Sequence, residues 1–268
     1  MTKIKNYQPH AFSYNEAKNT SNSSKQVYIT YNNEKKPFEL STPTMYLPWQ
    51  VKGWPNNNGD ITKYDITLSF GNMDENPRTK MMYDKIMVFD DKIFHDAIKQ
   101  EYVQDWFGKK KIKGGLDGLD PNFKRQIRHS MDKETDKPDG KYPPTFKAKL
   151  AMWDGKFKFD MFDKEGNKLL INDDERDNSG QILYDPIKLL TGGTKVKCLI
   201  QSTGLWFAGG NNVSANFGHG WKVKQLMIMS DITTTTKKCN IEVDSDEEEI
   251  DDDANSNIEA SDSDDELK

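Results

Sequence analysis

The sequence predicts a mainly β fold with one long amphipathic helix and a disordered acidic tail at its C-terminal end. Short runs of alternating apolar and polar residues recur along the chain, and one segment alone has a strong helical period. The charge also divides sharply. The 268 residues carry a net charge of −5, but residues 242–268 hold 14 acidic side chains and one lysine, so residues 1–241 carry +8. A basic body of this kind is typical of proteins that bind a polyanion.

The N-terminal part predicts an arm followed by extended segments. Residues 1–25 are rich in Asn, Ser and Lys and have little periodicity, so we expect a flexible arm. Residues 27–32 alternate apolar and polar side chains and predict a first strand. Residues 44–70 contain two extended runs around the turn sequence PNNNGD. The arm is therefore expected to lead into a β domain over residues 26–231.

Residues 76–107 predict the long helix. Asn76 can cap its first turn, and Pro77 fits there because the missing N–H group would have no partner in a helix. Apolar side chains then recur every three or four residues and form one stripe. The stripe consists of Met82, Ile86, Phe89, Ile93 and Ala97.

The second half of the domain predicts an insertion and then further strands. Residues 108–144 have mixed charge with several Gly and Pro residues and indicate a long loop, in which PNFKRQIRHSM predicts a short helix. Residues 146–153 and 156–162 alternate around an Asp-Gly turn and predict a hairpin. Residues 167–171, 194–208 and 221–230 supply more strands. The total is five to seven strands, followed by a disordered tail over residues 232–268.

The sequence lacks the motifs of several protein classes. There is no phosphate-binding GxxxxGK[ST], no GxSxG and no HExxH, and the two cysteines and four histidines have no metal-ligand spacing. We therefore expect no catalytic site, no metal and no cofactor. No apolar run approaches the length of about 20 residues that spans a bilayer, and the first residues lack the apolar core of a signal peptide. An intracellular protein without a membrane association is expected.

Rings and lysines placed together indicate binding to single-stranded nucleic acid. Such binding needs cations along the phosphate path and ring faces on which bases stack, and small barrels of the OB type supply both. The stretch TGLWFAGGNNVSANFGHGWKVK at residues 203–224 combines rings, flexible residues and lysines. Burial of its rings in the core remains the alternative. The candidate binding residues are Trp206, Phe207, Trp221, Lys222, Lys224, Lys195, Lys197, Lys147, Lys149, Lys52, Trp54 and Trp153.

The order of these features resembles the single-stranded DNA-binding proteins of T7-like phages, a family with homologues in nucleocytoplasmic large DNA viruses. The resemblance covers about residues 25–231 and rests on NPRTKMMYDKI, TFKAKL, KFKFDMFDKEGNKL, DPIKLLTGGTKVKCLIQSTGLWF and VSANFGHGWKVKQLMIM, followed by the acidic tail. It implies an OB-fold barrel with an extra helix that binds single-stranded DNA without catalysis. In the family pattern, Trp206 and Phe207 match the aromatic pair, and Lys195 and Lys197 match the lysine-alternating strand. The insertion at residues 108–144 departs from that pattern.

The resemblance also implies roles for the tail and for partners. It implies coating of single-stranded DNA during viral replication, recombination or repair, in a host cytoplasmic viral factory or the host nucleus. The tail would modulate access to DNA and recruit a viral DNA polymerase and helicase–primase, although this chain ends DELK where the phage family ends in an aromatic residue. The oligomeric state is left open by the sequence, and a homodimer is one possibility. The acidic residues assigned to partner contacts are Asp246, Glu247, Glu248, Glu249, Asp251, Asp252, Asp253, Asp264, Asp265 and Glu266.

Three other functions fit parts of the pattern. An RNA-binding protein or nucleic-acid chaperone would use the same fold, because nothing in the sequence reads the 2′-hydroxyl group. A scaffold similar to a histone chaperone would act through the acidic tail. A β-sandwich that binds carbohydrate would use the exposed rings, but the basic body disfavours it.

Overall fold

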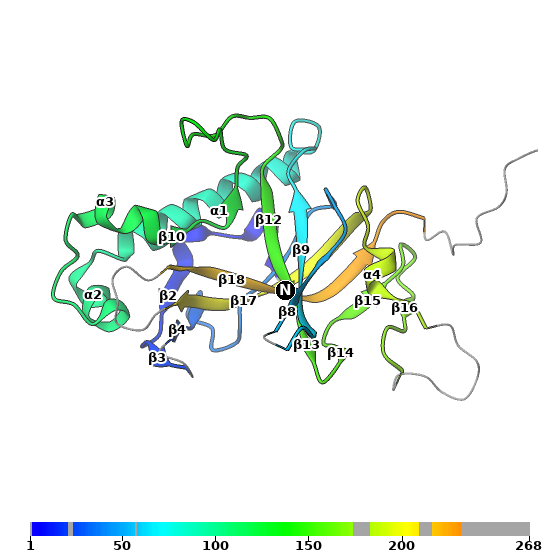
Figure 1. Cartoon of the computed structure of the whole chain (residues 1–268), viewed down its shortest axis with the longest axis horizontal. Helices are drawn as coiled ribbons and strands as arrows, with labels where there is room; N and C mark the ends of the chain where they lie inside the picture. The colour runs from blue at the N-terminus through cyan, green and yellow to red at the C-terminus, as the bar shows by residue number, and fades with distance from the viewer. Residues whose placement is uncertain (1, 21–23, 57, 174–182, 209–215, 232–268) are drawn as a thin grey trace, which may run out of the picture. The chain divides into compact units, whose positions relative to one another are not determined.

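The structure is a computed structural model that describes residues 2–20, 24–56, 58–173, 183–208 and 216–231. The predicted disordered tail, with the ten acidic residues assigned to partner contacts, lies outside these residues. The prediction of a mainly β fold is confirmed. Four longer strands build the main sheet, and Figure 1 shows them at the centre of the fold. They are β9 (Ile61–Ser69), β12 (Thr145–Leu150), β17 (Lys195–Phe207) and β18 (Phe217–Ile228).

The four strands form two antiparallel pairs, and one strand of the first pair runs parallel to one strand of the second. β9 pairs with β12, β17 pairs with β18, and β12 runs parallel to β18. The short β7 (Met45–Tyr46) links β17 back to β9, so the pairings return to their starting strand. However, β7 meets β9 only at Tyr46 and Ser69, and β12 meets β18 only at Lys149 and Lys222. Ladders this short leave the expected barrel incompletely closed.

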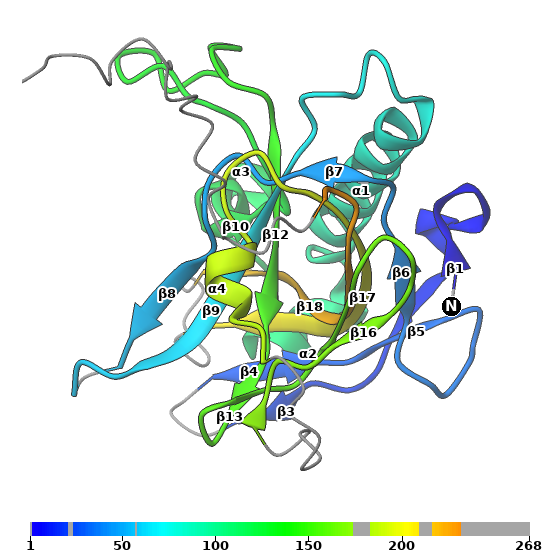
Figure 2. The same cartoon turned by 90° about the vertical axis from the view of Figure 1, so that its right-hand side faces the viewer.

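Many short strands surround these four. The described residues contain 18 strands where the sequence predicted five to seven, because alternation over two or three residues is too short to recognise. Figure 2 shows the hairpin of β8 and β9 projecting away from the other strands. The remaining strands are β1 (Thr2–Lys3), β2 (Phe12–Tyr14), β3 (Lys18–Asn19), β4 (Lys25–Val27), β5 (Ile29–Tyr31), β6 (Glu39–Ser41), β8 (Lys52–Pro55), β10 (Phe123–Lys124), β11 (Ile127–Arg128), β13 (Met152–Trp153), β14 (Lys156–Phe157), β15 (Asp160–Phe162) and β16 (Lys168–Leu169).

The predicted long helix is present but broken into two. The Asn76 side chain accepts a hydrogen bond from the Arg78 N–H at 3.0 Å, and the predicted apolar stripe is fully buried. The break follows Asp96, whose carboxylate accepts a hydrogen bond from the Tyr14 hydroxyl at 2.8 Å and pairs with Lys99 at 2.5 Å. The helices are α1 (Pro77–Asp96), α2 (Gln100–Phe107), α3 (Gly115–Leu119) and α4 (Pro186–Leu189), with 3-10 turns η1 (Ile4–Asn6), η2 (Pro9–Ala11) and η3 (Asp120–Asn122).

The N-terminal residues belong to the folded body, which corrects the prediction of a flexible arm. Tyr7 is 0% exposed and Phe12 is 5% exposed. The Phe12 ring lies 4.3 Å from the Phe89 ring of α1, measured between centroids. The two buried rings anchor this segment. The prediction missed them because the segment is otherwise rich in Asn, Ser and Lys.

Residues 108–144 also differ from the prediction. The expected short helix in PNFKRQIRHSM is wrong, because β10 pairs with β18 and β11 pairs with β12 instead. Phe123 stands opposite Phe217 of β18, with 5.1 Å between ring centroids. The exposed edges of two longer strands therefore override the local helical preference of this segment. The supposed loop extends the sheet.

Candidate nucleic-acid interface

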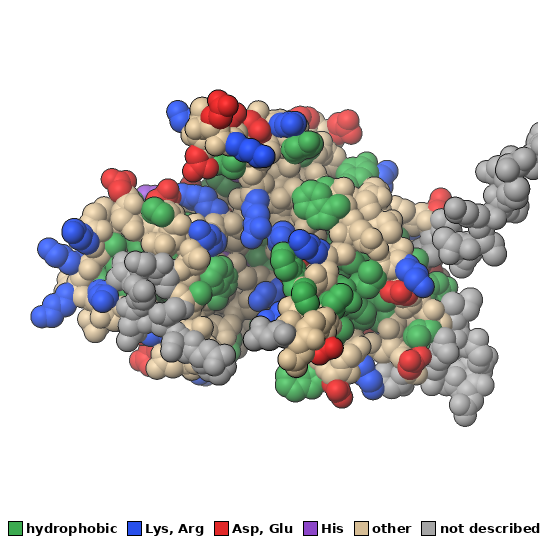
Figure 3. Space-filling model, viewed as in Figure 1, with side chains coloured by type: hydrophobic (Ala, Val, Ile, Leu, Met, Phe, Trp, Pro, Cys, Tyr) green, Lys and Arg blue, Asp and Glu red, His purple; other side chains and the backbone are tan. Residues whose placement is uncertain are grey.

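A cationic groove crosses the outer face of β12 and β18 and has a volume of about 250 Å³. Figure 3 shows Lys and Arg side chains gathered over the middle of this face. Asp65 is the one carboxylate among the described residues that line it. We call this surface the β12–β18 groove. Its charged and ring-bearing lining consists of Lys124, Arg125, Arg128, Lys147, Lys149, Asp65, Trp206, His219 and Trp221.

Strand register explains why the lysines share this face. Lys149 of β12 stands opposite Asp65 of β9 on one side and opposite Lys222 of β18 on the other. Residues directly opposed in a ladder point to the same face of a sheet, and residues two apart on one strand do so as well. Lys147, Lys149 and Lys222 therefore point outward, whereas Ala148 and Leu150 are buried beneath them. The register therefore places these three candidate lysines on one face.

Trp54 presents an accessible ring beside the groove. It lies on β8 and is 39% exposed. The Lys52 ammonium is 4.4 Å from the centre of its ring, and the Lys147 ammonium is 5.6 Å away. The indole N–H donates a hydrogen bond to Asp65 Oδ2 at 3.0 Å, which fixes the ring. An exposed ring with two cations near it can stack on a base while the cations contact neighbouring phosphates.

Trp206 contributes a second ring, and two glycines make room for it. It is half-buried on β17, opposite Gly218 of β18. A Cβ atom on Gly218 would lie 3.2 Å from the Trp206 ring and 2.7 Å from the Lys124 carbonyl oxygen. A Cβ atom on Gly220 would lie 2.5 Å from the Thr203 hydroxyl and 3.7 Å from the same ring. The glycines beside these aromatic residues therefore let the indole lie against the strand.

Two predicted stacking residues are in the core, which corrects the prediction for them. Phe207 and Trp221 are each 2% exposed. The Phe207 ring stacks on Phe217 at 5.6 Å with an interplanar angle of 2° and also contacts Trp106 of α2. The Trp221 indole N–H donates a hydrogen bond to Gln126 Oε1 at 2.5 Å. Neither ring offers a face to a base, because each is almost fully buried, although Trp221 borders the groove.

A buried polar network lies beneath the groove. Asp90 of α1 accepts hydrogen bonds from the backbone N–H of Gln126 at 2.8 Å and from its Nε2 at 2.7 Å. The Gln126 amide nitrogen is therefore a donor and its Oε1 is an acceptor. His219 Nδ1 carries a hydrogen and donates it to Gln126 Oε1 at 3.1 Å, and His219 Nε2 accepts a hydrogen bond from the Ser202 hydroxyl at 2.8 Å. Burial lowers the pKa of His219 to about 3, so its ring is neutral. Burial likewise raises the pKa of Asp90 to about 6, against the opposing effect of its hydrogen bonds with Gln126.

Three cations of the groove come from the segment that this network holds, and the sequence prediction missed them. Gln126 lies between Arg125 and Arg128, and Lys124 precedes both. Arg125 pairs with Asp91 at 3.1 Å and Asp120 at 3.7 Å, so part of its charge is compensated. The pKa of Lys147 is lowered, first by burial and then by the positive charge of Arg128. The sequence feature that could have identified this part of the groove is the presence of three cations within residues 124–128.

Five of the predicted residues lie elsewhere. The Lys195 ammonium lies 5.3 Å from the centre of the Tyr46 ring, and Lys197 lines a separate pocket. Lys224 is the extra residue of a β-bulge, because Leu199 pairs with Gln225 and Ile200 with Val223. It lines another pocket, together with Lys156 and Lys158. Trp153, 75% exposed, stands at the tip of the β13–β14 hairpin. Phe207, as described, is in the core.

The described residues contain no group of three or more His, Cys, Asp or Glu side chains that could hold a metal ion. Among the helices described, none is long and apolar enough to cross a membrane.

Comparisons with known proteins give distant structural neighbours. No protein-family model matches the chain, and no curated protein matches it. The single-stranded DNA-binding protein from bacteriophage Enc34, in complex with ssDNA, aligns with a TM-score of 0.39 and 13% identity over 81% of this chain and 95% of that chain. The single-stranded DNA-binding protein gp2.5 of bacteriophage T7 aligns with a TM-score of 0.37 and 15% identity over 75% and 96% of the two chains.

Proposed function

We propose that this chain binds single-stranded DNA in the β12–β18 groove and is not an enzyme. One observation carries the proposal. Two accessible rings, Trp54 and Trp206, flank a face on which Lys147, Lys149 and Lys222 point outward. Single-strand binding requires ring faces for the bases and cations for the phosphates. Neither contact depends on a particular base sequence.

The strand order supports a fold of the OB type for this function. Five strands, β7, β9, β12, β18 and β17, follow one another in a ring with two short junctions. An OB-fold is a five-stranded, partly open barrel that binds oligonucleotides on one face. The groove lies on that kind of face, where β9, β12 and β18 are neighbours.

A titration with oligo-dT at several salt concentrations tests the proposal. The logarithm of the affinity should fall linearly with the logarithm of salt concentration, with a slope of about −0.7 for each phosphate neutralised. Lys149→Ala should weaken binding and make this slope shallower. Lys133→Ala is the matched control, because Lys133 is also exposed but does not line the groove. Tighter binding to duplex than to single strands, or an affinity independent of salt, would contradict the proposal.

The acidic tail extends the proposal to regulation and partners. We propose that this protein coats single strands in viral DNA replication, recombination or repair, and that its tail recruits a DNA polymerase and helicase–primase. With −13 charges against +8 on the rest of the chain, the tail should also compete electrostatically with DNA. Truncation after Thr236 should then tighten ssDNA binding at low salt, and the gain should shrink as salt screens the charges. Weaker binding by the truncated chain at low salt would refute the competition.

A further inference from the structure

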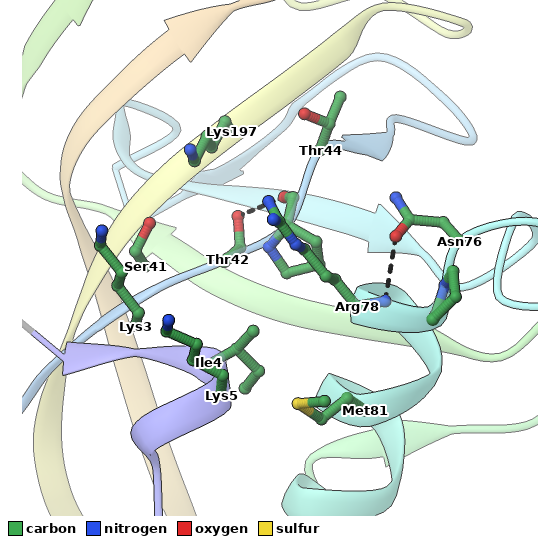
Figure 4. Close-up of a pocket in the computed structure, with 12 residues that line it drawn as sticks. Lys3, Ile4, Lys5, Ser41, Thr42, Thr44, Asn76, Arg78, Met81 and Lys197 are labelled. Atoms are coloured by element: carbon green, nitrogen blue, oxygen red, sulfur yellow. Dashed lines mark hydrogen bonds between the residues drawn. The ribbon is translucent and has the colours of Figure 1, made fainter.

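A second cationic pocket lies apart from the β12–β18 groove and shares no lining residue with it. It has a volume of about 730 Å³ and lies between β1, the connection from β6 to β7, the start of α1, and β17. Figure 4 shows the charged ends of Lys3, Lys5, Arg78 and Lys197 around one space. We call this surface the α1–β17 pocket. Four cations from three separate parts of the chain converge there.

The positive charge of the α1–β17 pocket is not compensated by the described residues. No Asp or Glu is among the lining residues within the described part of the chain. The side chains of Lys3, Lys5, Arg78 and Lys197 form no ion pair within the described part of the chain, and all four are exposed. Like charges around one pocket repel one another, so a bound anion would relieve the repulsion. The pocket is therefore suited to an acidic ligand.

The uncharged lining indicates which acidic ligand fits. No aromatic ring is among the described residues that line the pocket, so they offer bases no stacking surface of the kind that Trp54 and Trp206 provide. Pro43, Pro77 and Met81 instead give the pocket an apolar part, for which a phosphate chain has no matching group. Its volume falls in the range of about 300–1,000 Å³ that is usual for ligand sites. Carboxylates together with an aliphatic side chain match both parts of the lining.

We propose that the α1–β17 pocket binds an acidic peptide segment of a partner protein, with an aliphatic side chain between the carboxylates. The Arg78 guanidinium can hold one carboxylate through two parallel hydrogen bonds, and the three lysines supply charge for the others. The aliphatic side chain contacts Met81 and the two prolines. This site does not depend on DNA binding in the β12–β18 groove.

Fluorescence anisotropy with the full chain and a labelled peptide, Asp-Glu-Leu-Asp-Glu, tests this site. Arg78→Ala should weaken peptide binding about tenfold, as expected for the loss of a charge-assisted, two-bond contact. Replacing the leucine of the peptide by alanine should weaken binding about fivefold, because less apolar surface is buried. Lys133→Ala removes the same charge from an exposed position outside the pocket and should leave binding unchanged.

Further variants separate this site from the groove and from loss of folding. Lys149→Ala should weaken oligo-dT binding but leave peptide binding intact, so each proposal can fail alone. Lys197→Ala serves as a second pocket variant, and melting temperatures close to that of the unsubstituted chain show that both pocket variants fold. Unchanged peptide affinity in both would overturn the proposal. It would also be overturned if both variants lost affinity for oligo-dT and the peptide failed to bind, because the pocket would then be a nucleic-acid site.

Discussion

Trp206 and Phe207 are neighbours in the sequence but lie on opposite faces of β17. Trp206 is half-buried against Gly218 and Gly220 and lines the β12–β18 groove. Phe207 is 2% exposed and packs among the rings of Phe217, Trp106 and Phe107. The outer face of the β17–β18 hairpin is thus open and cationic, and its inner face is closed by α2. Under the proposed function, the same kind of side chain serves binding on one face and stability on the other.

The largest expected effect follows from breaking the inner face. Phe207→Ala should lower the free energy of unfolding by about 3–5 kcal/mol, because it leaves a cavity among stacked rings. Chemical denaturation measures this loss. The fraction that stays folded should keep most of its affinity for oligo-dT. A large loss of DNA affinity with unchanged stability would show that the ring acts in binding and not in packing.

The buried network beneath the groove should make stability depend on pH. Burial raises the pKa of Asp90 to about 6 in the folded chain, so the folded state holds this proton more tightly than the unfolded chain does. Its contribution to stability is therefore complete below about pH 4 and is lost as the pH rises through about 6. The loss can reach about 3 kcal/mol.

Asp90→Asn is the variant that isolates this effect, because asparagine does not titrate. Denaturation of both proteins between pH 4 and pH 7 should give a difference in unfolding free energy that moves in favour of the variant as the pH rises. A difference that is constant across this range would show that Asp90 does not titrate there.

Breaking the outer face should affect binding more than folding. Trp206→Ala should cost about 1–3 kcal/mol of ssDNA affinity, as expected for the loss of one stacking partner. Its unfolding free energy should change much less than that of Phe207→Ala, since part of the ring is already exposed. Fluorescence titration and denaturation of the two variants side by side measure the contrast. Equal stability losses in both would remove the proposed division between the faces.

The smallest expected effect concerns one phosphate contact. Arg128→Ala should weaken ssDNA binding similarly for all base sequences and make the salt dependence shallower by about 0.7 in slope. Titrations with oligo-dT and oligo-dA at several salt concentrations measure both properties. An unchanged slope would place Arg128 outside the path of the strand.

Several local features could be predicted because short segments determine them. Asn76 caps α1 and the apolar stripe of that helix is buried as predicted, since capping and helical period depend on residues only a few positions apart. The Asp154-Gly155 turn joins β13 to β14, and both residues have positive φ angles, 52° and 71°, as a type I′ hairpin turn requires. The division between a basic body and an acidic tail is likewise a property of the sequence alone.

The composition of the groove was decided by the tertiary structure. In β17, Val196, Cys198 and Ile200 are buried, but after a register shift between Ser202 and Gly204 the buried residues are Leu205 and Phe207. Simple alternation from Lys195 and Lys197 would have placed Phe207 outside and Trp206 inside. The bulge at Thr203 reverses this order, and a bulge depends on the partner strand as much as on its own sequence.

The same reason applies to the cations of the groove. Lys124, Arg125 and Arg128 reach it because β10 and β11 pair with β18 and β12, strands that follow them in the chain. By itself the sequence determined that rings and lysines are abundant, where the long helix begins and which stripe of it is buried. Which of these residues face one another was decided by the tertiary structure, because strand pairing brings together segments far apart in the chain.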